Sequence, residues 1–244
     1  ALLANPGFLI PVSGGSGADR VDARRLFNSP ATLSGGGGND VLIGSAQGDW
    51  LLGEADNDSL TGGAGADRLE GGQGQDTLNG GSDGDFLAGG AGNDRMLGGA
   101  GDDRLGSSEA FGGAAPETGS DTVLGGAGDD TVNMIGAAAI DALDWIAGGA
   151  GNDVLRIHDL VGEAALAALD RVTGFESVTI LGNSFGAILR IGDGLADSAE
   201  TPLSVFAQGA FAVVLDASAV TSSGVELRRG PALRADTLIG GGGA

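Results

Sequence analysis

Residues 62–79 read GGAGADRLEGGQGQDTLN, which is two consecutive copies of the nine-residue pattern G-G-x-G-x-D-x-apolar-x. Six further close copies occupy residues 14–22, 35–43, 89–97, 98–106, 125–133 and 148–156. A short fixed period is typical of a solenoid, in which each repeat packs only against its neighbours. Within one repeat, the glycines permit tight turns, the Asp adds a carboxylate, and the single apolar residue can face a narrow core.

The Asp at position six of each repeat sets the register of the chain. Counted from this Asp, eleven consecutive nonapeptides fill residues 35–133. One of them, SSEAFGGAA at 107–115, is interpreted as a decayed repeat with Gly112 in the place of the Asp. Four others lose glycines but keep their carboxylates: Asp49, Asp58, Asp85 and Asp121. Within this chain the carboxylate is therefore retained more faithfully than the glycines around it.

Breaks in the register predict five segments. They are an N-terminal coil with one repeat (1–34), the main repeat block (35–133), offset repeats (134–156), an irregular β-solenoid segment (157–233) and a truncated repeat (234–244). In the irregular segment, Asp159 is expected to cap a short helix at 161–170. Apolar runs predict strands at 178–181, 187–191, 203–207, 211–215 and 225–228. Because the chain starts without Met and ends in GGGGA, we expect a fragment of a longer protein.

The repeat predicts an all-β fold, a right-handed parallel β-roll or β-helix. Six glycine-rich residues would form a turn and the three residues x-apolar-x a short strand, so that two repeats make one coil. Successive coils would pair in parallel and build two sheets that face each other. The position-eight residues would point inward between the sheets: Leu42, Leu51, Leu60, Leu69, Leu78, Leu87, Met96, Leu105, Val123 and Val132.

The composition is that of an acidic, glycine-rich chain. Gly accounts for 50 of 244 residues, and the net charge of −21 argues against a nucleic-acid partner. The lack of Cys excludes disulfides, thiolate zinc sites and Cys nucleophiles. No apolar run approaches the roughly 18 residues that a membrane span needs. The apolar stretch 1–12 lacks Met and a basic region, so it does not have the features of a signal peptide.

The charge and the thin core together predict bound cations. One apolar residue per nonapeptide buries too little surface to offset the conformational entropy lost on folding. The negative charge also opposes compaction unless cations neutralise it. Hard cations suit carboxylate and carbonyl oxygens, and Ca²⁺ tolerates irregular coordination better than Mg²⁺ does.

Repeats two apart would lie on the same edge of the roll, so that their turns stack. One edge is predicted to carry Asp40, Asp58, Asp76, Asp94, Gly112 and Asp130, and the other Asp49, Asp67, Asp85, Asp103 and Asp121. An ion between neighbouring turns would contact two carboxylates and backbone carbonyl oxygens. The intact neighbour pairs predict about seven Ca²⁺, which would bring the net charge from −21 to about −7.

The repeat resembles that of the RTX (repeats-in-toxin) family of calcium-binding parallel β-helices. The resemblance implies a protein exported unfolded by type I secretion that folds outside the cell around Ca²⁺. It implies side-chain ligands at Asp19, Asp40, Asp49, Asp58, Asp67, Asp76, Asp85, Asp94, Asp103, Asp121, Asp130, Asp144, Asp153 and Asp236. It implies carbonyl ligands at Gly36, Gly38, Gly63, Gly65, Gly72, Gly74, Gly90, Gly92, Gly99, Gly101, Gly126, Gly128, Gly149 and Gly151.

The sequence leaves two functional interpretations open. The first is a structural or adhesive role in an extracellular or cell-surface protein, with other copies of the chain or cell-surface components as candidate partners. VTGFESVTI (172–180) and LDASAV (215–220) favour it, because they resemble segments of large RTX adhesins and S-layer-like proteins. The alternative is the secretion and folding module of an exported enzyme or toxin whose catalytic domain lies elsewhere. A disordered linker is disfavoured in calcium by the regular apolar residue, although disorder is expected without calcium.

Catalysis within this chain is not predicted. GNSFG at 182–186 matches the G-x-S-x-G pattern around Ser184, but the sequence after it is strand-like rather than helical. The single His, His158, precedes the Ser and is interpreted as a surface or packing residue. Paired carboxylates such as Asp102 and Asp103 recur with the repeat, and therefore belong to its turns rather than to an acid–base pair.

Overall fold

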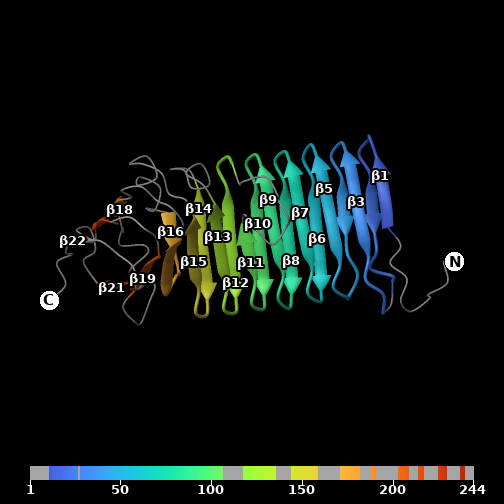
Figure 1. Cartoon of the computed structure of the whole chain (residues 1–244). Helices are drawn as coiled ribbons and strands as arrows, with labels where there is room; N and C mark the ends of the chain where they lie inside the picture. Colours follow the sequence, from blue (N-terminus) through green and yellow to red (C-terminus); the bar gives the residue numbers. More distant parts are fainter. Residues whose placement is uncertain are drawn as a thin grey trace.

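The computed structural model describes residues 11–26, 28–106, 118–135, 144–158, 171–181, 188–190, 203–208, 214–216, 225–229 and 237–239. These residues form strands and turns, and the strands pair in parallel within three sheets. The two larger sheets face each other along the length of the molecule (Figure 1). The predicted all-β parallel β-roll is confirmed.

Sheet A has eleven strands, and each pairs with the next along the molecule. In spatial order they are β1 (Pro11–Gly15), β3 (Thr32–Gly37), β5 (Trp50–Ala55), β7 (Arg68–Gln73), β9 (Phe86–Ala91), β11 (Arg104–Gly106), β13 (Thr131–Ile135), β15 (Val154–His158), β17 (Ser177–Leu181), β19 (Leu203–Gln208) and β21 (Val225–Arg229).

Sheet B lies opposite sheet A and has eight strands. They are β2 (Arg20–Asp22), β4 (Val41–Ile43), β6 (Ser59–Ala64), β8 (Thr77–Ser82), β10 (Arg95–Ala100), β12 (Thr122–Ala127), β14 (Trp145–Ala150) and β16 (Val172–Thr173). Sheet C consists of β18 (Ile188–Arg190), β20 (Val214–Asp216) and β22 (Thr237–Ile239).

Consecutive strands enter opposite sheets, so each coil crosses the molecule twice. In the regular part, Leu51 lies opposite Leu69 in sheet A, and Leu60 opposite Leu78 in sheet B. Partners are thus 18 residues apart, which confirms the predicted coil of two nonapeptides.

The strands are longer than the three residues predicted. β6 extends over six residues, through Gly62 and Gly63 of the following repeat. Glycine makes this extension possible because successive coils approach closely: a Cβ on Gly63 would lie 2.6 Å from the carbonyl oxygen of Ser45. The ladder of strand pairing therefore continues into the turns, where the position-six side chains stand.

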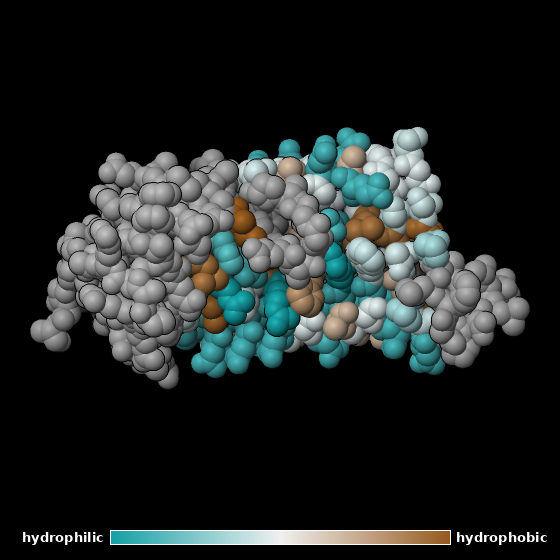
Figure 2. All heavy atoms as spheres, viewed as in Figure 1, coloured by the Kyte–Doolittle hydropathy of each residue, from teal (hydrophilic) through white to brown (hydrophobic). Residues whose placement is uncertain are grey.

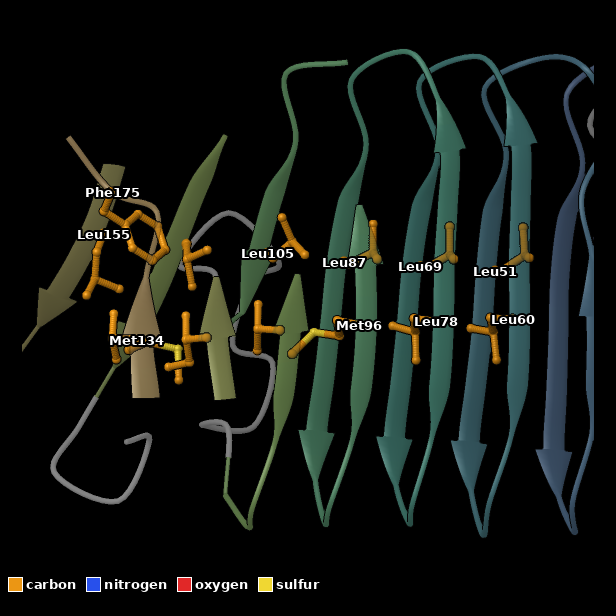
Figure 3. Close-up of a cluster of buried hydrophobic side chains, with 14 of the residues drawn as sticks. Leu51, Leu60, Leu69, Leu78, Leu87, Met96, Leu105, Met134, Leu155 and Phe175 are labelled. Atoms are coloured by element: carbon orange, nitrogen blue, oxygen red, sulfur yellow. The ribbon is translucent and has the colours of Figure 1, made fainter. Parts of the chain in front are cut away.

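The position-eight residues point inward, as predicted. All are at most 1% exposed: Leu42, Leu51, Leu60, Leu69, Leu78, Leu87, Met96, Leu105, Val123 and Val132. Figure 3 shows two facing rows between the sheets: Leu51, Leu69, Leu87 and Leu105 in one, and Leu60, Leu78 and Met96 in the other. From β13 onward, sheet A adds a second buried row, Met134, Ile157 and Ile180. In the strand pairing, these residues align with a position that a turn glycine, such as Gly89, occupies in earlier coils.

One sequence prediction is wrong: the nonapeptide 107–115 does not form a layer of the stack. β10 pairs directly with β12, and β11 with β13, so partners there are 27 residues apart. The layers before and after this nonapeptide are therefore immediate neighbours. Gly112 itself lies outside the described residues.

The C-terminal strands agree with the apolar runs of the sequence. Three of the predicted strands extend sheet A as β17, β19 and β21, and two others overlap β18 and β20 of sheet C. His158 lies at the end of β15 and pairs in register with Ile135 and Leu181. The helix predicted at 161–170 and Ser184 lie outside the described residues.

On the face shown in Figure 2, the described residues are mainly hydrophilic, with a few apolar side chains among them. The exposed large apolar side chains of the described roll are Val12, Leu26, Trp50 and Trp145, which come from four separate places in the chain. Within the part of the chain that the structure describes, no helix has the length and hydropathy needed to cross a bilayer.

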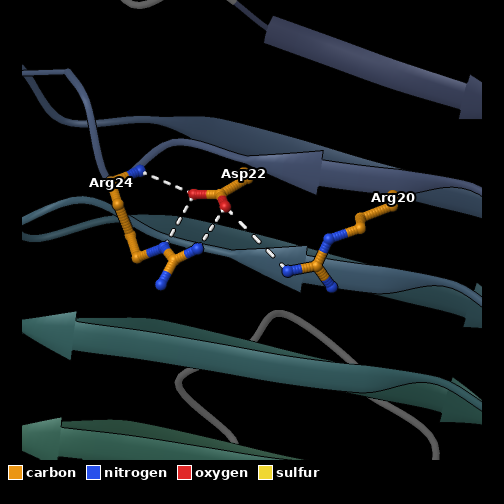
Figure 4. Close-up of polar contacts among 3 residues, drawn as sticks. All are labelled: Arg20, Asp22 and Arg24. Atoms are coloured by element: carbon orange, nitrogen blue, oxygen red, sulfur yellow. Dashed lines mark hydrogen bonds and ion pairs between the residues drawn. The ribbon is translucent and has the colours of Figure 1, made fainter.

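Charged side chains on the outer faces make local contacts. The Arg24 guanidinium donates to both carboxylate oxygens of Asp22 at 2.6 and 2.9 Å, and Arg20 lies 3.9 Å away (Figure 4). The hydrogen bond from Arg24 lowers the pKa of Asp22 to about 2. On sheet A, the Arg68 guanidinium lies 4.8 Å from the ring centroid of Trp50. These contacts connect residues within one coil or between neighbouring coils.

Candidate metal sites between stacked turns

The turns form two stacks, one along each edge of the roll. The first edge holds turns that lead into sheet B, with position-six residues Asp19, Asp40, Asp58, Asp76, Asp94, Asp121 and Asp144. The second edge holds turns that lead into sheet A, with Asp49, Asp67, Asp85, Asp103, Asp130, Asp153 and Glu176. The predicted edges of Asp121 and Asp130 are therefore exchanged, because one nonapeptide is not a layer.

A ladder of hydrogen bonds connects the position-six residues along each stack. The N–H of Asp58 donates to Oδ1 of Asp76 at 2.8 Å, and the N–H of Asp67 donates to Oδ1 of Asp85 at 2.8 Å. The same bond recurs along both edges at 2.7–2.9 Å. One oxygen of each carboxylate is thus engaged with the preceding coil.

The other carboxylate oxygen, Oδ2, is buried and has no hydrogen-bond partner at Asp40, Asp58, Asp67, Asp76, Asp85, Asp94, Asp103, Asp130 and Asp153. These side chains are at most 3% exposed. Buried polar atoms nearly always have partners, and an unpaired buried charge is strongly unfavourable. The same atom lacks a partner in one turn after another, which indicates that each of these turns binds the same kind of ligand.

A backbone carbonyl of the next turn lies beside most of these oxygens. A Cβ built on Gly71 would lie 2.5 Å from Oδ2 of Asp76 and 2.6 Å from the carbonyl oxygen of Gly89, one coil further on. The same pair of oxygens surrounds Gly62 and Gly80 in their turns. Glycine at position one therefore leaves a small space lined by oxygens from two successive turns.

Burial raises the pKa of eight of these carboxyls. The pKa rises to about 7 at Asp67, Asp94 and Asp130, to about 6 at Asp58, Asp85, Asp103 and Asp153, and also above its usual value at Asp76. Desolvation is the main cause, and at most of these sites the charges of neighbouring acidic groups add to it. Carboxylates in such a place ionise readily only when a positive charge is close.

The donor set fits Ca²⁺, a hard cation that takes carboxylate and carbonyl oxygens. Over the described ranges, no group of three or more His, Cys, Asp or Glu side chains is close enough to hold a metal ion. This result is expected of turns in which successive layers supply one carboxylate each and the backbone supplies the other oxygens. When bound, Ca²⁺ would add the positive charge that the buried oxygens lack.

The first turn of the second edge differs from the others. Oδ2 of Asp49 accepts a hydrogen bond from the Ser45 N–H, and Oδ1 accepts from the Ser45 hydroxyl at 3.0 Å and from the Ala31 N–H at 2.5 Å. Both oxygens are thus partnered by the protein. Ser45 stands where other repeats have a glycine, and its N–H donates to Oδ2, the oxygen that has no hydrogen-bond partner in nine of the other turns. Among the predicted ligands, Asp49 fits a calcium site least well.

Positions two and four of the regular turns adopt positive φ, as all the glycines predicted to donate carbonyls do: Gly36, Gly38, Gly63, Gly65, Gly72, Gly74, Gly90, Gly92, Gly99, Gly101, Gly126, Gly128, Gly149 and Gly151. Three non-glycine residues at these two positions of the turns share this conformation: Glu54, Asp56 and Asp83, with φ of 82°, 73° and 75°. Asp56 and Asp83 each accept a hydrogen bond from a glycine N–H of the preceding coil at 3.0 Å, which offsets their backbone strain.

Sequence reasoning missed one member of the second stack, Glu176. Its carboxylate accepts a hydrogen bond from the Asp153 N–H at 2.7 Å, as an Asp does in the regular turns. The repeat pattern gave no signal for it, since the residue type and the spacing both differ. Asp144 is fully buried in the first stack, and Asp236 lies outside the described residues.

The family model of the RTX calcium-binding nonapeptide repeat (4 copies) matches the chain at residues 32–51, 43–78, 70–105, 117–133 and 141–156. A search of the curated proteins finds no match. The matched residues include most of both stacks of turns. The described molecule is a parallel β-roll with oxygen-lined turns, and its repeats match the model of the RTX calcium-binding nonapeptide, as predicted.

Proposed function

We propose that this chain is a calcium-triggered β-roll segment of an extracellular or cell-surface protein that leaves the cell by type I secretion. The observation that supports it is the double column of buried Asp oxygens without protein partners. The column explains why folding would depend on calcium, and secretion by type I systems is typical of RTX repeat proteins.

The turn residues would couple ion binding to folding in a direct way. Oδ1 of Asp76 accepts the N–H of Asp58, while Oδ2 of the same residue faces the gap toward the Gly89 turn. An ion in that gap would hold two coils together, which the unfolded chain cannot do. Because Ca²⁺ would bind only to the stacked turns, it would stabilise the folded roll by mass action. At low calcium, repulsion among the acidic residues would keep the chain unfolded.

The proposed role of the roll is structural or adhesive, and we propose no catalytic residue within it. Support comes from its extended form, in which sheet A continues through eleven parallel strands. A solenoid of this kind presents long, flat faces and holds distant segments of a protein apart.

Far-UV circular dichroism tests the calcium trigger. The chain should be disordered in EDTA and should gain β-structure in millimolar Ca²⁺, with a matching contraction in size-exclusion chromatography. Equal spectra in EDTA and in Ca²⁺ would sink the proposal. Its cellular part is tested with antibodies against the folded roll, which should label intact cells or the culture medium. Detection in the cytoplasm alone would contradict export.

A further inference from the structure

The last described turn between sheet B and sheet A, residues 174–176, is shorter than the turn that precedes it on the second edge. It joins β16 to β17, while the preceding turn joins β14 to β15 through Gly148 and Asp153. Residues that pair before the turn, such as Ile146 and Val172, are 26 positions apart in the sequence. Residues that pair after the turn are 23 positions apart. Three residues are therefore missing from the turn itself.

The shortened turn nevertheless keeps both oxygen positions of a regular turn. The Gly174 carbonyl takes the place of a position-one carbonyl, because a Cβ on Gly148 would clash with it and would lie 2.6 Å from Oδ2 of Asp153. The Glu176 carboxylate takes the place of a position-six Asp, because its Oε2 accepts the Asp153 N–H at 2.7 Å. In the regular stack, the carboxyl of Asp153 itself accepts the Asp130 N–H at 2.8 Å.

The change from Asp to Glu matches the change in turn length. With three residues fewer, the backbone follows a different path between Gly174 and β17, and the longer Glu side chain still brings its carboxylate to the Asp153 N–H. The residue between them, Phe175, is fully buried at the end of the core and fixes the position of the turn (Figure 3).

Asp153 supplies the observation that points to a ligand in this gap. Its side chain is 0% exposed, and its Oδ2 has no hydrogen-bond partner and faces the Gly174 turn. The neighbouring carboxylate of Glu176 adds a second negative group. Two acidic groups and a carbonyl oxygen thus lie close together, and one of the carboxylate oxygens is buried without a partner. A bound cation would compensate the negative charge of this arrangement.

We propose that the 174–176 turn completes one more calcium site, formed by the carboxylates of Asp153 and Glu176 with the carbonyl of Gly174. This inference rests on the proposed calcium-dependent function and extends it to a turn that the nonapeptide pattern does not describe. The family match ends at residue 156, before this turn. The site closes the second stack at the last described layer of sheet B.

The test compares the number of bound ions in two charge-matched variants of the chain. Glu176→Gln removes the charge but keeps an oxygen that can accept the Asp153 N–H, so the hydrogen-bond ladder is preserved. Glu70→Gln removes the same charge from the outer face of β7, where its strand neighbours are Leu52 and Ala88. Native mass spectrometry at saturating Ca²⁺ should show one ion fewer in Glu176→Gln and no loss in Glu70→Gln.

Equal ion counts in Glu176→Gln and wild type overturn the inference. A wild-type chain that binds no calcium refutes the proposed function instead, so the two failures are distinct. If Glu176→Gln loses several ions through unfolding, crystals of the wild-type chain grown with Ca²⁺ decide the question. An anomalous difference peak beside Oδ2 of Asp153 and the Gly174 carbonyl supports the site, and its absence there, with peaks at the regular turns, overturns it.

Discussion

Asp102 and Asp103 are adjacent residues whose carboxylates differ in their contacts and burial. Their comparison provides the sharpest test of the turn sites. Oδ1 of Asp103 accepts the Asp85 N–H at 2.8 Å, and its Oδ2 is buried without a partner. Oδ1 of Asp102 accepts the Asp129 N–H at 2.9 Å on the exposed side of the turn. Substitution of either residue by Asn removes one negative charge and retains the accepting oxygen. Only Asp103→Asn is expected to weaken calcium binding strongly.

The structure sets the size of the expected effect. Asp103 touches two gaps in its stack, since Oδ1 reaches the Asp85 layer and Oδ2 faces the carbonyl of Gly125 in the next layer. A site with free ligand at 100 times its dissociation constant stabilises the folded state by about 2.7 kcal/mol. Asp103→Asn should therefore remove up to roughly 5 kcal/mol at that calcium level, where two sites fail. Asp102→Asn should stay within about 0.5 kcal/mol, as exposed substitutions usually do.

The assay is a calcium titration of the far-UV circular dichroism signal, followed by urea unfolding at one fixed calcium concentration. Asp103→Asn should shift the folding midpoint to higher Ca²⁺ and lower the urea midpoint, while Asp102→Asn should follow the wild type. Equal shifts in the two variants would mean that overall charge, and not the buried oxygen, controls folding. That result would refute the assignment of the turns as ion sites.

Three further predictions follow from the same geometry. Burial raises the folded pKa of Asp58 to about 6 and that of Asp67 to about 7, above the ordinary 3.8, so the stability that these protons give to the calcium-free roll is full below pH 3.8 and is lost as pH rises through 6 to 7. In EDTA, β-structure should therefore increase on acidification, and in Ca²⁺ the titration midpoint should rise as pH falls below about 7; pH-independent titrations would contradict this. Gly63→Ala, at φ 124° and 2.6 Å from a carbonyl, should destabilise the roll in urea unfolding far more than Gly37→Ala, whose nearest atom is 3.9 Å away. Leu69→Ala should lower the unfolding free energy by about 2–5 kcal/mol, and a loss below 1 kcal/mol would show a core that carries little stability.

The regular half of the roll could be predicted from the sequence because each nonapeptide repeats the same physical requirements. A glycine such as Gly72 is needed at φ 116°, a Leu such as Leu78 fills the space between the sheets, and an Asp such as Asp76 stands between turns. Since neighbouring coils supply nearly all contacts of a coil, local pattern and fold coincide. The length of the strands was underestimated, because glycines were assigned to turns although they also extend the ladder.

The exchange of edges after residue 106 could not be predicted from spacing alone. The nonapeptide 107–115 has the same length as a repeat, so the count of Asp positions stays in phase whether or not it forms a layer. Its composition carried the missing signal: Gly112 replaces the carboxylate, and Ala114 replaces the large apolar residue at position eight. A unit with neither group offers no ligand and little apolar surface to bury. When its neighbours stack directly on each other, the roll therefore loses no ligand and little buried surface. Glu176 was missed for a different reason, since its role depends on a tertiary register that the sequence does not display.

The two edges of the roll differ in how they accommodate added chain. Between β9 and β17, the segments outside the described layers, 107–117, 136–143 and 159–170, all lie between a strand of sheet A and the next strand of sheet B, which is the first edge. Over the same range, the second edge keeps a compact turn at every layer, down to the three-residue version before β17. Met134 and Ile157, on the strands of sheet A before the last two of these connections, replace turn glycines and are buried, and the same holds for Ile180 on the next strand, β17.

This replacement changes what holds the layers together along the molecule. In the coils before β11, each layer has one inward side chain per strand and a carboxylate at both edges, so its stability would depend on ions at both edges. In the coils after β13, sheet A adds a second apolar side chain per strand, and each is worth about 1.5–3 kcal/mol when buried. The C-terminal layers therefore need less calcium than the N-terminal ones. Calcium removal should open the roll first at the regular repeats, which hydrogen exchange at intermediate Ca²⁺ would show as faster exchange in β4–β10 than in β13–β17.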